Sequence, residues 1–296
     1  MTLTGIHVPL ITPFNADGSV AIDAVAELAT GALDSGAAGL VAFGTTAEVA
    51  ALSVGERTEI LDVCTRICRE RDASLIVGAG GGDTAATLRA LEELAGHAAA
   101  LVTVPSFTRP GEAGVFAHFA HLAAHSPVPL VIYHIPYRTG QQLSAATLRQ
   151  LGALPGIVGV KYAVGGIDAQ TVELFADLPA DIDVLIGDDV FAGPAFAIGA
   201  SGGILASANV VTAPFVELHQ AWQRADLARA RDLGGTLGRL AAALFAEPNP
   251  TVLKGVLHAT GRIPTADVRL PLVPASQDSV DAALELLAGL GQTQSQ

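Results

Sequence analysis

Short apolar runs alternate with longer segments of helical period along most of this chain. Each apolar run suits a buried parallel strand, because such strands carry hydrophobic residues on both faces. Eight of these runs occur, beginning near Ile6, Gly39, Ser74, Ala99, Pro129, Ile157, Asp183 and Gly202. The segments between them predict helices at 21–36, 54–71, 83–97, 112–125, 144–153, 168–177 and 189–199. Eight strands with helical connections are the number that closes a (β/α)8 barrel.

An open doubly wound sheet would show the same local pattern, but it carries a dinucleotide-binding fingerprint. The glycine-rich stretch at 78–82 has neither the spacing of that fingerprint nor the Lys-Ser/Thr ending of a phosphate-binding loop. We interpret this stretch as the turn after the third strand. The predicted fold is therefore α/β, a TIM barrel.

The strand pattern stops near residue 212, which divides the chain into a barrel (1–212) and a C-terminal region (213–296). Helical periods in the second part predict helices at 214–231, 233–245, 250–260 and 277–290. We expect this small helical region to pack on the barrel and to end in a polar, frayed tail at 292–296.

Charge and cysteine content narrow the class of protein. The net charge is −13 and no basic run occurs, which argues against binding to nucleic acid or to an anionic membrane surface. Cys64 and Cys68 have no further partners for a disulfide framework or a zinc site, so we expect a reducing, cytoplasmic setting. We expect no signal peptide at the N-terminus and no membrane span, because no uninterrupted apolar run reaches about 18 residues.

One lysine stands at the end of a predicted strand. Of 16 basic residues only Lys161 and Lys254 are lysines, and Lys161 directly follows the apolar run 156–160. A primary amine can condense with a carbonyl to a Schiff base, and burial lowers its pKa enough to free the lone pair. The alternative is a strand-end lysine that is paired with a carboxylate. Lys254 falls in a predicted C-terminal helix, where we expect a structural role with Glu247 as its partner.

Strand alternation predicts what lies beside Lys161. If Lys161 points into the barrel, Gly159 and Ile157 should do so too, while Val158 and Val160 pack on the outer helices.

Polar side chains follow several of the predicted strands, and a barrel places its chemistry at the C-terminal ends of its strands. These strand-end residues are Gly44, Thr45 and Thr46 after the second strand, Tyr133 and Arg138 after the fifth, Lys161 after the sixth, Asp188 and Asp189 after the seventh, and Ser207 and Asn209 after the eighth. An amine, a phenol, two hydroxyls and a guanidinium are thus predicted to meet in one pocket.

Several motifs in order resemble one known family, the dihydrodipicolinate synthase and N-acetylneuraminate lyase superfamily of class I aldolases. The motifs are Thr12-Pro-Phe14, Gly44-Thr-Thr-Ala-Glu-Val-Ala-Ala-Leu-Ser53, Tyr133-His-Ile-Pro-Tyr-Arg-Thr-Gly140, Gly159-Val-Lys161, Ile186-Gly-Asp-Asp189, Gly203-Ile204, Asn209, Asn249-Pro250 with Lys254, and Arg269-Leu-Pro-Leu-Val-Pro274. The segments around Arg138 and Arg269 resemble the 4-hydroxy-tetrahydrodipicolinate synthase branch more than the sialic acid lyases.

The resemblance implies roles for the strand-end residues. Lys161 would form an imine with pyruvate or a related 2-oxo acid, Tyr133 would move protons, and Thr45 would work beside it. Gly44 and Thr46 would complete a turn that holds the oxo-acid carboxylate, since backbone N–H groups and hydroxyls there can bind an anion. By the same resemblance, Arg138 would hold the carboxylate of the second substrate, and Ile204 would line the site with its carbonyl group.

One position departs from the family pattern. The family usually carries, after the fourth strand, a tyrosine that crosses a tight dimer interface and completes a proton relay, but here the matching residue is Phe107. Phenylalanine carries no transferable proton. Either Ser106, Tyr137, Tyr162 or water replaces it, or the enzyme catalyses a reaction that does not need this relay.

Two clusters raise the question of a metal. His118, His121 and His125 share one face of a predicted helix, but no carboxylate joins them at ligand spacing. Asp188 and Asp189 could hold a divalent ion, although we favour a role as N-cap of the helix that follows. We therefore predict no metal and no cofactor beyond the covalent imine.

The sequence thus predicts a Schiff-base lyase that joins or cleaves pyruvate and an aldehyde, with aspartate semialdehyde implied as the aldehyde. An aldolase or dehydratase acting on 2-keto-3-deoxy sugar acids or 4-hydroxy-2-oxoglutarate is the alternative. A catalytically impaired barrel that only binds an oxo acid is a third possibility, which the departure at Phe107 keeps open. Family resemblance implies a homo-oligomer, a dimer or a homotetramer.

Overall fold

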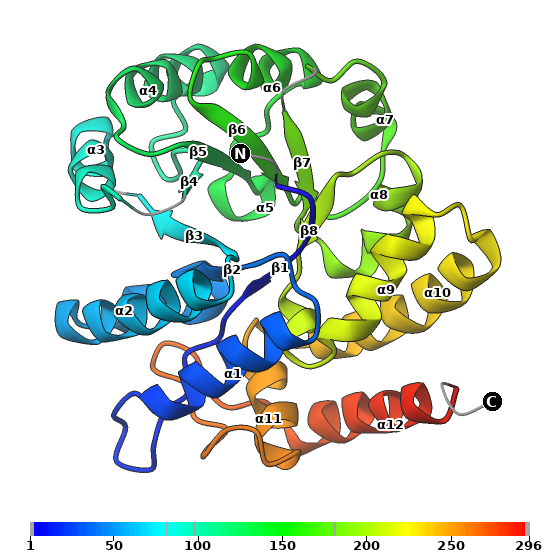
Figure 1. Ribbon diagram of the computed structural model, residues 1–296. Coiled ribbons are helices and arrows are strands. Elements are labelled where there is room, and N and C mark those ends of the chain that lie inside the picture. Colours follow the sequence, from blue (N-terminus) through cyan, green and yellow to red (C-terminus); the bar gives the residue numbers. More distant parts are fainter. Residues whose placement is uncertain (1–2, 81, 97–98, 180–181, 294–296) are drawn as a thin grey trace.

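The computed structural model describes residues 3–80, 82–96, 99–179 and 182–293. Eight parallel strands close into a barrel in the order β1 to β8, and β8 pairs with β1 (Figure 1). The strands are β1 (Gly5–Pro9), β2 (Gly39–Ala42), β3 (Ser74–Ala79), β4 (Ala99–Thr103), β5 (Leu130–His134), β6 (Ile157–Tyr162), β7 (Asp183–Ile186) and β8 (Gly202–Ile204). Each begins at or next to its predicted position, and the predicted TIM barrel is confirmed.

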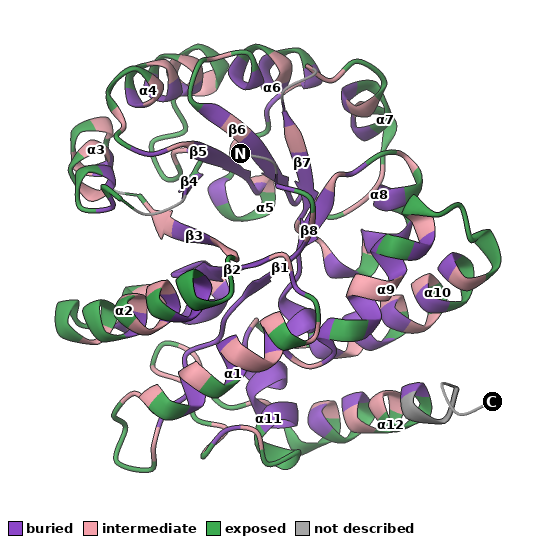
Figure 2. Ribbon diagram, viewed as in Figure 1, coloured by how far each residue is buried: buried purple, intermediate pink, exposed green. Residues whose placement is uncertain are grey.

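Helices cover the outside of the barrel, with one buried and one exposed face each (Figure 2). They are α1 (Ile22–Asp34), α2 (Val54–Glu70), α3 (Thr84–Glu92), α4 (Gly111–His125), α6 (Ala145–Gly152), α7 (Ala169–Ala176), α8 (Ala192–Ala197) and α9 (Thr212–Gln223). The short helix α5 (Pro136–Thr139) and the 3-10 turns η1 (Thr45–Ala47), η2 (Val49–Ala51) and η4 (Ala206–Asn209) were not predicted, whereas the turn η3 (Asp189–Phe191) begins the helix predicted at 189–199. A single helical turn is too short to show a period in sequence.

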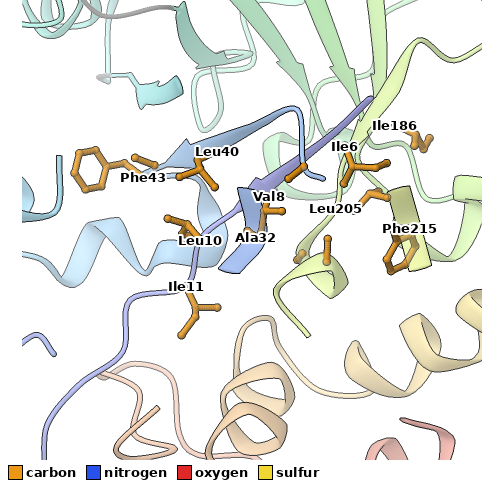
Figure 3. Close-up of a cluster of buried hydrophobic side chains, with 14 of the residues drawn as sticks. Ile6, Val8, Leu10, Ile11, Ala32, Leu40, Phe43, Ile186, Leu205 and Phe215 are labelled. Carbon is orange, nitrogen blue, oxygen red and sulfur yellow. The ribbon is translucent and has the colours of Figure 1, made fainter. Parts of the chain in front are cut away.

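Two apolar layers hold the barrel together. The outer layer lies between strands and helices, and Figure 3 shows the part of it that surrounds β1, including Ile6, Val8, Leu40 and Phe215. The inner layer fills the barrel and consists of Leu3, Val41, Ile76, Ala99, Leu101, Val131, Tyr133, Ile135, Ala163, Leu185 and Ile204. Strand residues alternate between the two layers, so the same alternation decides which side chains at the strand ends point into the barrel.

The expected alternation along β6 is wrong at its start. Ile157 packs in the outer layer, and Val158 packs against the inner one. The cause is a register shift between β5 and β6, where Leu130 pairs with Ile157 but Val131 pairs with Gly159. The extra residue of this bulge reverses the pattern before it, whereas Gly159 and Lys161 keep the expected side.

The C-terminal helices are α10 (Leu227–Leu244), α11 (Thr251–Ala259) and α12 (Gln277–Thr293). In Figure 1, α11 and α12, in orange and red, lie together beside α10. Helix α9 contacts β1 and thus joins the outer ring of the barrel. The division of the chain at residue 212 stays a prediction. No helix in the described ranges is both long and apolar enough to cross a membrane.

The predicted helix break at 232 is wrong, because the break lies between α9 and α10 at 224–226. Ala225 has a positive φ of 57° there, and the Asp226 carboxylate caps α10 by accepting a hydrogen bond from the Arg229 N–H at 3.2 Å. The expected frayed tail falls largely at 294–296, outside the described residues.

Candidate active site

Lys161 and Tyr133 lie side by side on neighbouring strands. The register of β5 and β6 pairs the two residues directly. The Lys161 Nζ atom lies 4.3 Å from the centre of the Tyr133 ring, and the two residues are 5% and 6% exposed. Space for the lysine depends on Gly187, since a Cβ atom at that position would lie 2.8 Å from Lys161 Cε. A side chain directly after β7 would therefore displace the end of the lysine.

The Lys161 amine has no carboxylate partner among the residues that the structure describes. Burial lowers its pKa to about 8, and the nearby charge of Asp189 opposes the shift. Lys161 forms no ion pair within the described residues, whereas the Lys254 amine lies 2.7 Å from the Glu48 carboxylate. The expected pairing of Lys254 with Glu247 is wrong, because Glu247 instead accepts hydrogen bonds from Ser276 at 2.9 and 2.6 Å.

A tight turn of Gly44, Thr45 and Thr46 stands next to Tyr133. The Thr45 side chain is hydrogen-bonded to the Tyr133 phenol. Burial raises the pKa of Tyr133 to about 12, and this hydrogen bond opposes the rise. Tyr133 is therefore a neutral phenol at pH 7, able to donate a proton rather than to accept one until a neighbouring cation forms.

Gly78 makes room for this turn from the neighbouring strand. A Cβ atom at Gly78 would lie 2.0 Å from the carbonyl oxygen of Phe43, which itself has a positive φ of 56°. Only glycine permits so close an approach of the two backbones. The glycine-rich stretch predicted as a turn thus begins within β3, where its first residue supports the Gly44-Thr45-Thr46 turn.

A cavity of about 980 Å³ opens beside these residues. It is lined by Gly44, Thr45, Thr103, Ser106 and Tyr133, among others. Thr103 was missed in the sequence, although alternation from Leu101, an inner-layer residue, would have directed it into the barrel. Thr103 is the direct strand partner of Tyr133, so its hydroxyl stands at the same height of the barrel.

Arg138 and Ile204 occupy different depths of the barrel. Arg138 is exposed on α5, and its guanidinium carbon lies 5.5 Å from the centre of the Tyr137 ring. Ile204 is 1% exposed and belongs to the inner layer at the end of β8. The structure therefore brings an arginine to the surface of the strand-end face and an apolar residue to its interior.

Two aromatic residues do not join this group. Phe107 is 99% exposed and has a positive φ of 34°, so it makes almost no contact within its own chain. Tyr162 belongs to the outer layer, where its hydroxyl lies 3.3 Å from Thr171 Oγ1. Tyr162 therefore cannot replace a missing relay residue, while Ser106 lines the cavity and Tyr137 lies beside Arg138.

Asp188 and Asp189 tie neighbouring loops together. The Asp188 carboxylate accepts a hydrogen bond from the Gly165 N–H at 2.7 Å, and the Asp189 carboxylate accepts one from the Ser207 N–H at 2.5 Å. Neither side chain caps the following turn, so the expected N-cap role is wrong. Burial raises the pKa of Asp189 to about 6, which places a titratable carboxyl near Lys161.

The histidine cluster on α4 divides between two environments. His118 is buried, with its Nδ1 atom 2.9 Å from Thr84 Oγ1, whereas the His121 and His125 rings stack with centres 4.4 Å apart. Across the ranges that the structure describes, no three His, Cys, Asp or Glu side chains are grouped so as to hold a metal ion.

Comparison with known proteins identifies the family of this chain. The model of the dihydrodipicolinate synthetase family matches residues 2–289. The chain belongs to this family. It is 35% identical over 292 residues to the 4-hydroxy-tetrahydrodipicolinate synthase of Neisseria meningitidis serogroup B, covering 98% of this chain and 99% of that protein. It is 34% identical over 280 residues to 4-hydroxy-tetrahydrodipicolinate synthase 2 of Clostridium acetobutylicum, covering 94% and 97% of the two chains.

Solved structures of the family share the fold closely. Dihydrodipicolinate synthase from Thermotoga maritima superposes with a TM-score of 0.93 at 29% identity, covering 98% of this chain and 99% of that one. The enzyme from Acinetobacter baumannii, solved with pyruvate, gives a TM-score of 0.91 at 31% identity, with coverage of 98% and 99%. Family membership confirms the prediction of a class I lyase, which forms a Schiff base through a lysine and needs no metal.

Proposed function

We propose that this member of the dihydrodipicolinate synthetase family condenses pyruvate with aspartate semialdehyde through an imine on Lys161. The observation that carries the proposal is the unpaired, buried Lys161 amine in contact with the Tyr133 phenol. A relative of known structure, that from Acinetobacter baumannii, is described in complex with pyruvate. The relatives named above are 4-hydroxy-tetrahydrodipicolinate synthases, and the chain aligns with nearly their full length.

The first steps follow from the placement of these groups. The neutral Lys161 amine attacks the pyruvate carbonyl carbon, and Tyr133 donates the proton with which the carbinolamine hydroxyl leaves as water. The Gly44-Thr45-Thr46 turn holds the pyruvate carboxylate through N–H groups and hydroxyls. The cationic iminium then favours the ionised phenol, so Tyr133 can remove a proton from the pyruvate methyl group, giving an enamine.

The second substrate completes the reaction. The enamine carbon attacks the aldehyde carbon, the aldehyde oxygen takes the proton that Tyr133 removed from the methyl group, and addition of water to the new iminium releases the product and the free Lys161 amine. Arg138, which is exposed on α5, would bind the carboxylate of the incoming aldehyde in a two-point pair. Ile204 supplies the apolar inner wall together with its carbonyl group. No cofactor takes part, because every covalent step uses the lysine.

We expect imine formation to increase with pH up to about the pKa of Lys161. Burial lowers this pKa from 10.5 to about 8, so the amine is mostly protonated and unreactive below that pH and free above it. At pH 7 about a tenth of the amine is free, compared with roughly 3 in 10⁴ at the unshifted pKa. The initial rate of borohydride trapping with pyruvate, measured from pH 6 to 10, should rise about tenfold per unit and level off near 8. A midpoint near 10.5 would contradict a desolvated amine.

A second candidate function follows from Phe107. This residue stands where family resemblance implies a relay tyrosine, and its 99% exposure leaves it free to enter a partner subunit. In an aldolase or dehydratase for 2-keto-3-deoxy sugar acids, Phe107 would supply an apolar wall rather than a proton. Ser106, which lines the cavity, could then meet a substrate hydroxyl.

The variant Phe107→Tyr distinguishes the two candidates. If the synthase function is right, the added phenol should not reduce the rate at which pyruvate condenses with aspartate semialdehyde. If the phenol works as a proton-transfer group, the rate should rise by up to about 10²-fold. If the sugar-acid function is right, native activity should fall and no synthase activity should appear. Both substrate classes are assayed for wild type, Phe107→Tyr and Arg138→Ala. Cleavage of a 2-keto-3-deoxy acid by wild type, without condensation, would overturn the synthase proposal but not the imine.

Two further proposals concern the oligomeric state and the cellular compartment. A dimer or homotetramer would cover Phe107 and the exposed Tyr137, which is 62% exposed in the single chain. One structural neighbour is described as a monomeric variant, so the state of assembly varies among relatives. The free, buried Cys64 and Cys68 suit a reducing, cytoplasmic setting.

A further inference from the structure

A buried carboxylate stands directly behind the turn that carries Thr45 and Thr46. Glu48 follows this turn and has a positive φ of 54°, so that the backbone reverses between η1 and η2. Its side chain is 2% exposed and lies against Lys254 of the C-terminal region. An ionised side chain held in a rare backbone conformation calls for specific partners.

Both oxygens of the Glu48 carboxylate have such partners, and both come from the end of the chain. Oε1 accepts a hydrogen bond from Lys254 Nζ at 2.7 Å, and Oε2 accepts one from the Arg269 N–H at 2.8 Å. Lys254 is fully buried, and its Nζ atom lies 4.0 Å from the centre of the Phe14 ring. Two bonds in different directions fix the orientation of the carboxylate, which a single surface ion pair would not do.

The turn itself is held at two further points. Asn249 donates a hydrogen bond through Nδ2 to Thr46 Oγ1 at 3.0 Å, and Thr12 donates one to the Ala47 carbonyl at 2.8 Å. Beyond Glu48, the Arg269 guanidinium donates to the Ala51 carbonyl at 2.8 Å. The segment from Thr46 to Ala51 is thus bound by three residues of the C-terminal region: Lys254 on α11, Asn249 just before α11, and Arg269 beyond it.

Stability alone accounts poorly for this arrangement. The desolvation of two charges often cancels their attraction, and apolar pairs of similar size commonly stabilise a fold as well as a buried ion pair does. What a fully bonded carboxylate adds is a unique geometry. That geometry is imposed on the backbone next to Thr45, which lines the cavity beside Tyr133, and next to the buried Thr46.

We propose that Glu48, Lys254 and Asn249 are positioning residues, through which the C-terminal region holds the Thr45–Thr46 turn in the geometry that binds the carboxylate of the oxo acid. This inference rests on the function proposed above. Within the described residues, no hydrogen bond or ion pair joins any of the three to the Lys161 amine, so their loss should weaken the binding of pyruvate more than it slows the chemistry at the amine.

The decisive variant is Glu48→Gln combined with Lys254→Met, which removes both buried charges and leaves neither unpaired. We expect the pyruvate concentration for half-maximal borohydride trapping on Lys161 to rise about tenfold or more, the effect of one lost well-made bond. The trapping rate at saturating pyruvate should change much less. Asn249→Ala, which removes only the bond to Thr46, should give a smaller rise in the same direction without threatening the fold.

A matched control separates positioning from loss of stability. Glu217→Gln breaks the ion pair with Arg229 at 2.7 Å, which joins α9 and α10 away from the cavity. It should lower the Tm without changing the pyruvate dependence. An unchanged pyruvate dependence in the folded double variant, or in Asn249→Ala if the double variant does not fold, would overturn the inference. If wild type forms no adduct at all, the proposed function fails, and the positioning role fails with it.

Discussion

Replacing Lys161 by arginine should abolish both borohydride trapping and turnover, while the fold is retained. Guanidinium keeps the positive charge but is not a nucleophile that forms an imine, so the covalent route is lost. A positioned reacting group is worth an effective concentration of 10⁵ M or more, and we expect a loss of about 10⁵-fold. Mass spectrometry of the trapped peptide and a steady-state assay measure the two effects.

The comparison has its own internal control, because the chain holds only two lysines. The adduct on wild type should map to Lys161 and not to Lys254, whose amine is buried and lies 2.7 Å from the Glu48 carboxylate. Arginine is larger than lysine, so Lys161→Met, which carries no charge and fits the same space beside Gly187, serves as a companion. An adduct on Lys254, or activity that persists in Lys161→Arg, would exclude the mechanism.

Tyr133→Phe should be the second most damaging change. It removes the hydroxyl that is hydrogen-bonded to Thr45, but it keeps the ring that contacts Lys161 and packs in the inner layer. Loss of a positioned proton-transfer group costs about 10²–10⁴-fold in rate, and we expect kcat to fall in that range with the Tm little changed. Steady-state kinetics with pyruvate, together with a thermal melt, provide the measurement.

A double-mutant cycle tests whether Tyr133 and Thr45 act as one unit. If the hydroxyl of Thr45 serves the phenol, Thr45→Val should slow the reaction, and adding it to Tyr133→Phe should cost little more. Full additivity of the two losses would show that they contribute independently. A Tyr133→Phe variant with wild-type kcat would remove Tyr133 from the chemistry and leave its contact with Lys161 as packing alone.

The fold could be predicted because a buried parallel strand can be recognised from a short stretch of sequence alone. The runs at Gly39, Ser74 and Asp183 begin where β2, β3 and β7 begin, since the residues that follow must be apolar or small to lie between two packed layers. The reversal at Ile157 and Val158 could not be predicted, because a bulge is a property of the pairing with β5. The break at Ala225 depends in the same way on a cap that Asp226 forms only once the helices are placed.

The amino-acid sequence by itself determined the barrel and the strand-end position of Lys161, because both follow from apolar periodicity and from the direction of parallel strands. Only the tertiary structure decided which lysine is unpaired. Glu48 and Lys254 are 206 residues apart in sequence and 2.7 Å apart in space, and no local pattern encodes such a contact. The tertiary structure likewise decided that Tyr162 faces outward and that Phe107 stands exposed, since burial depends on which elements pack together.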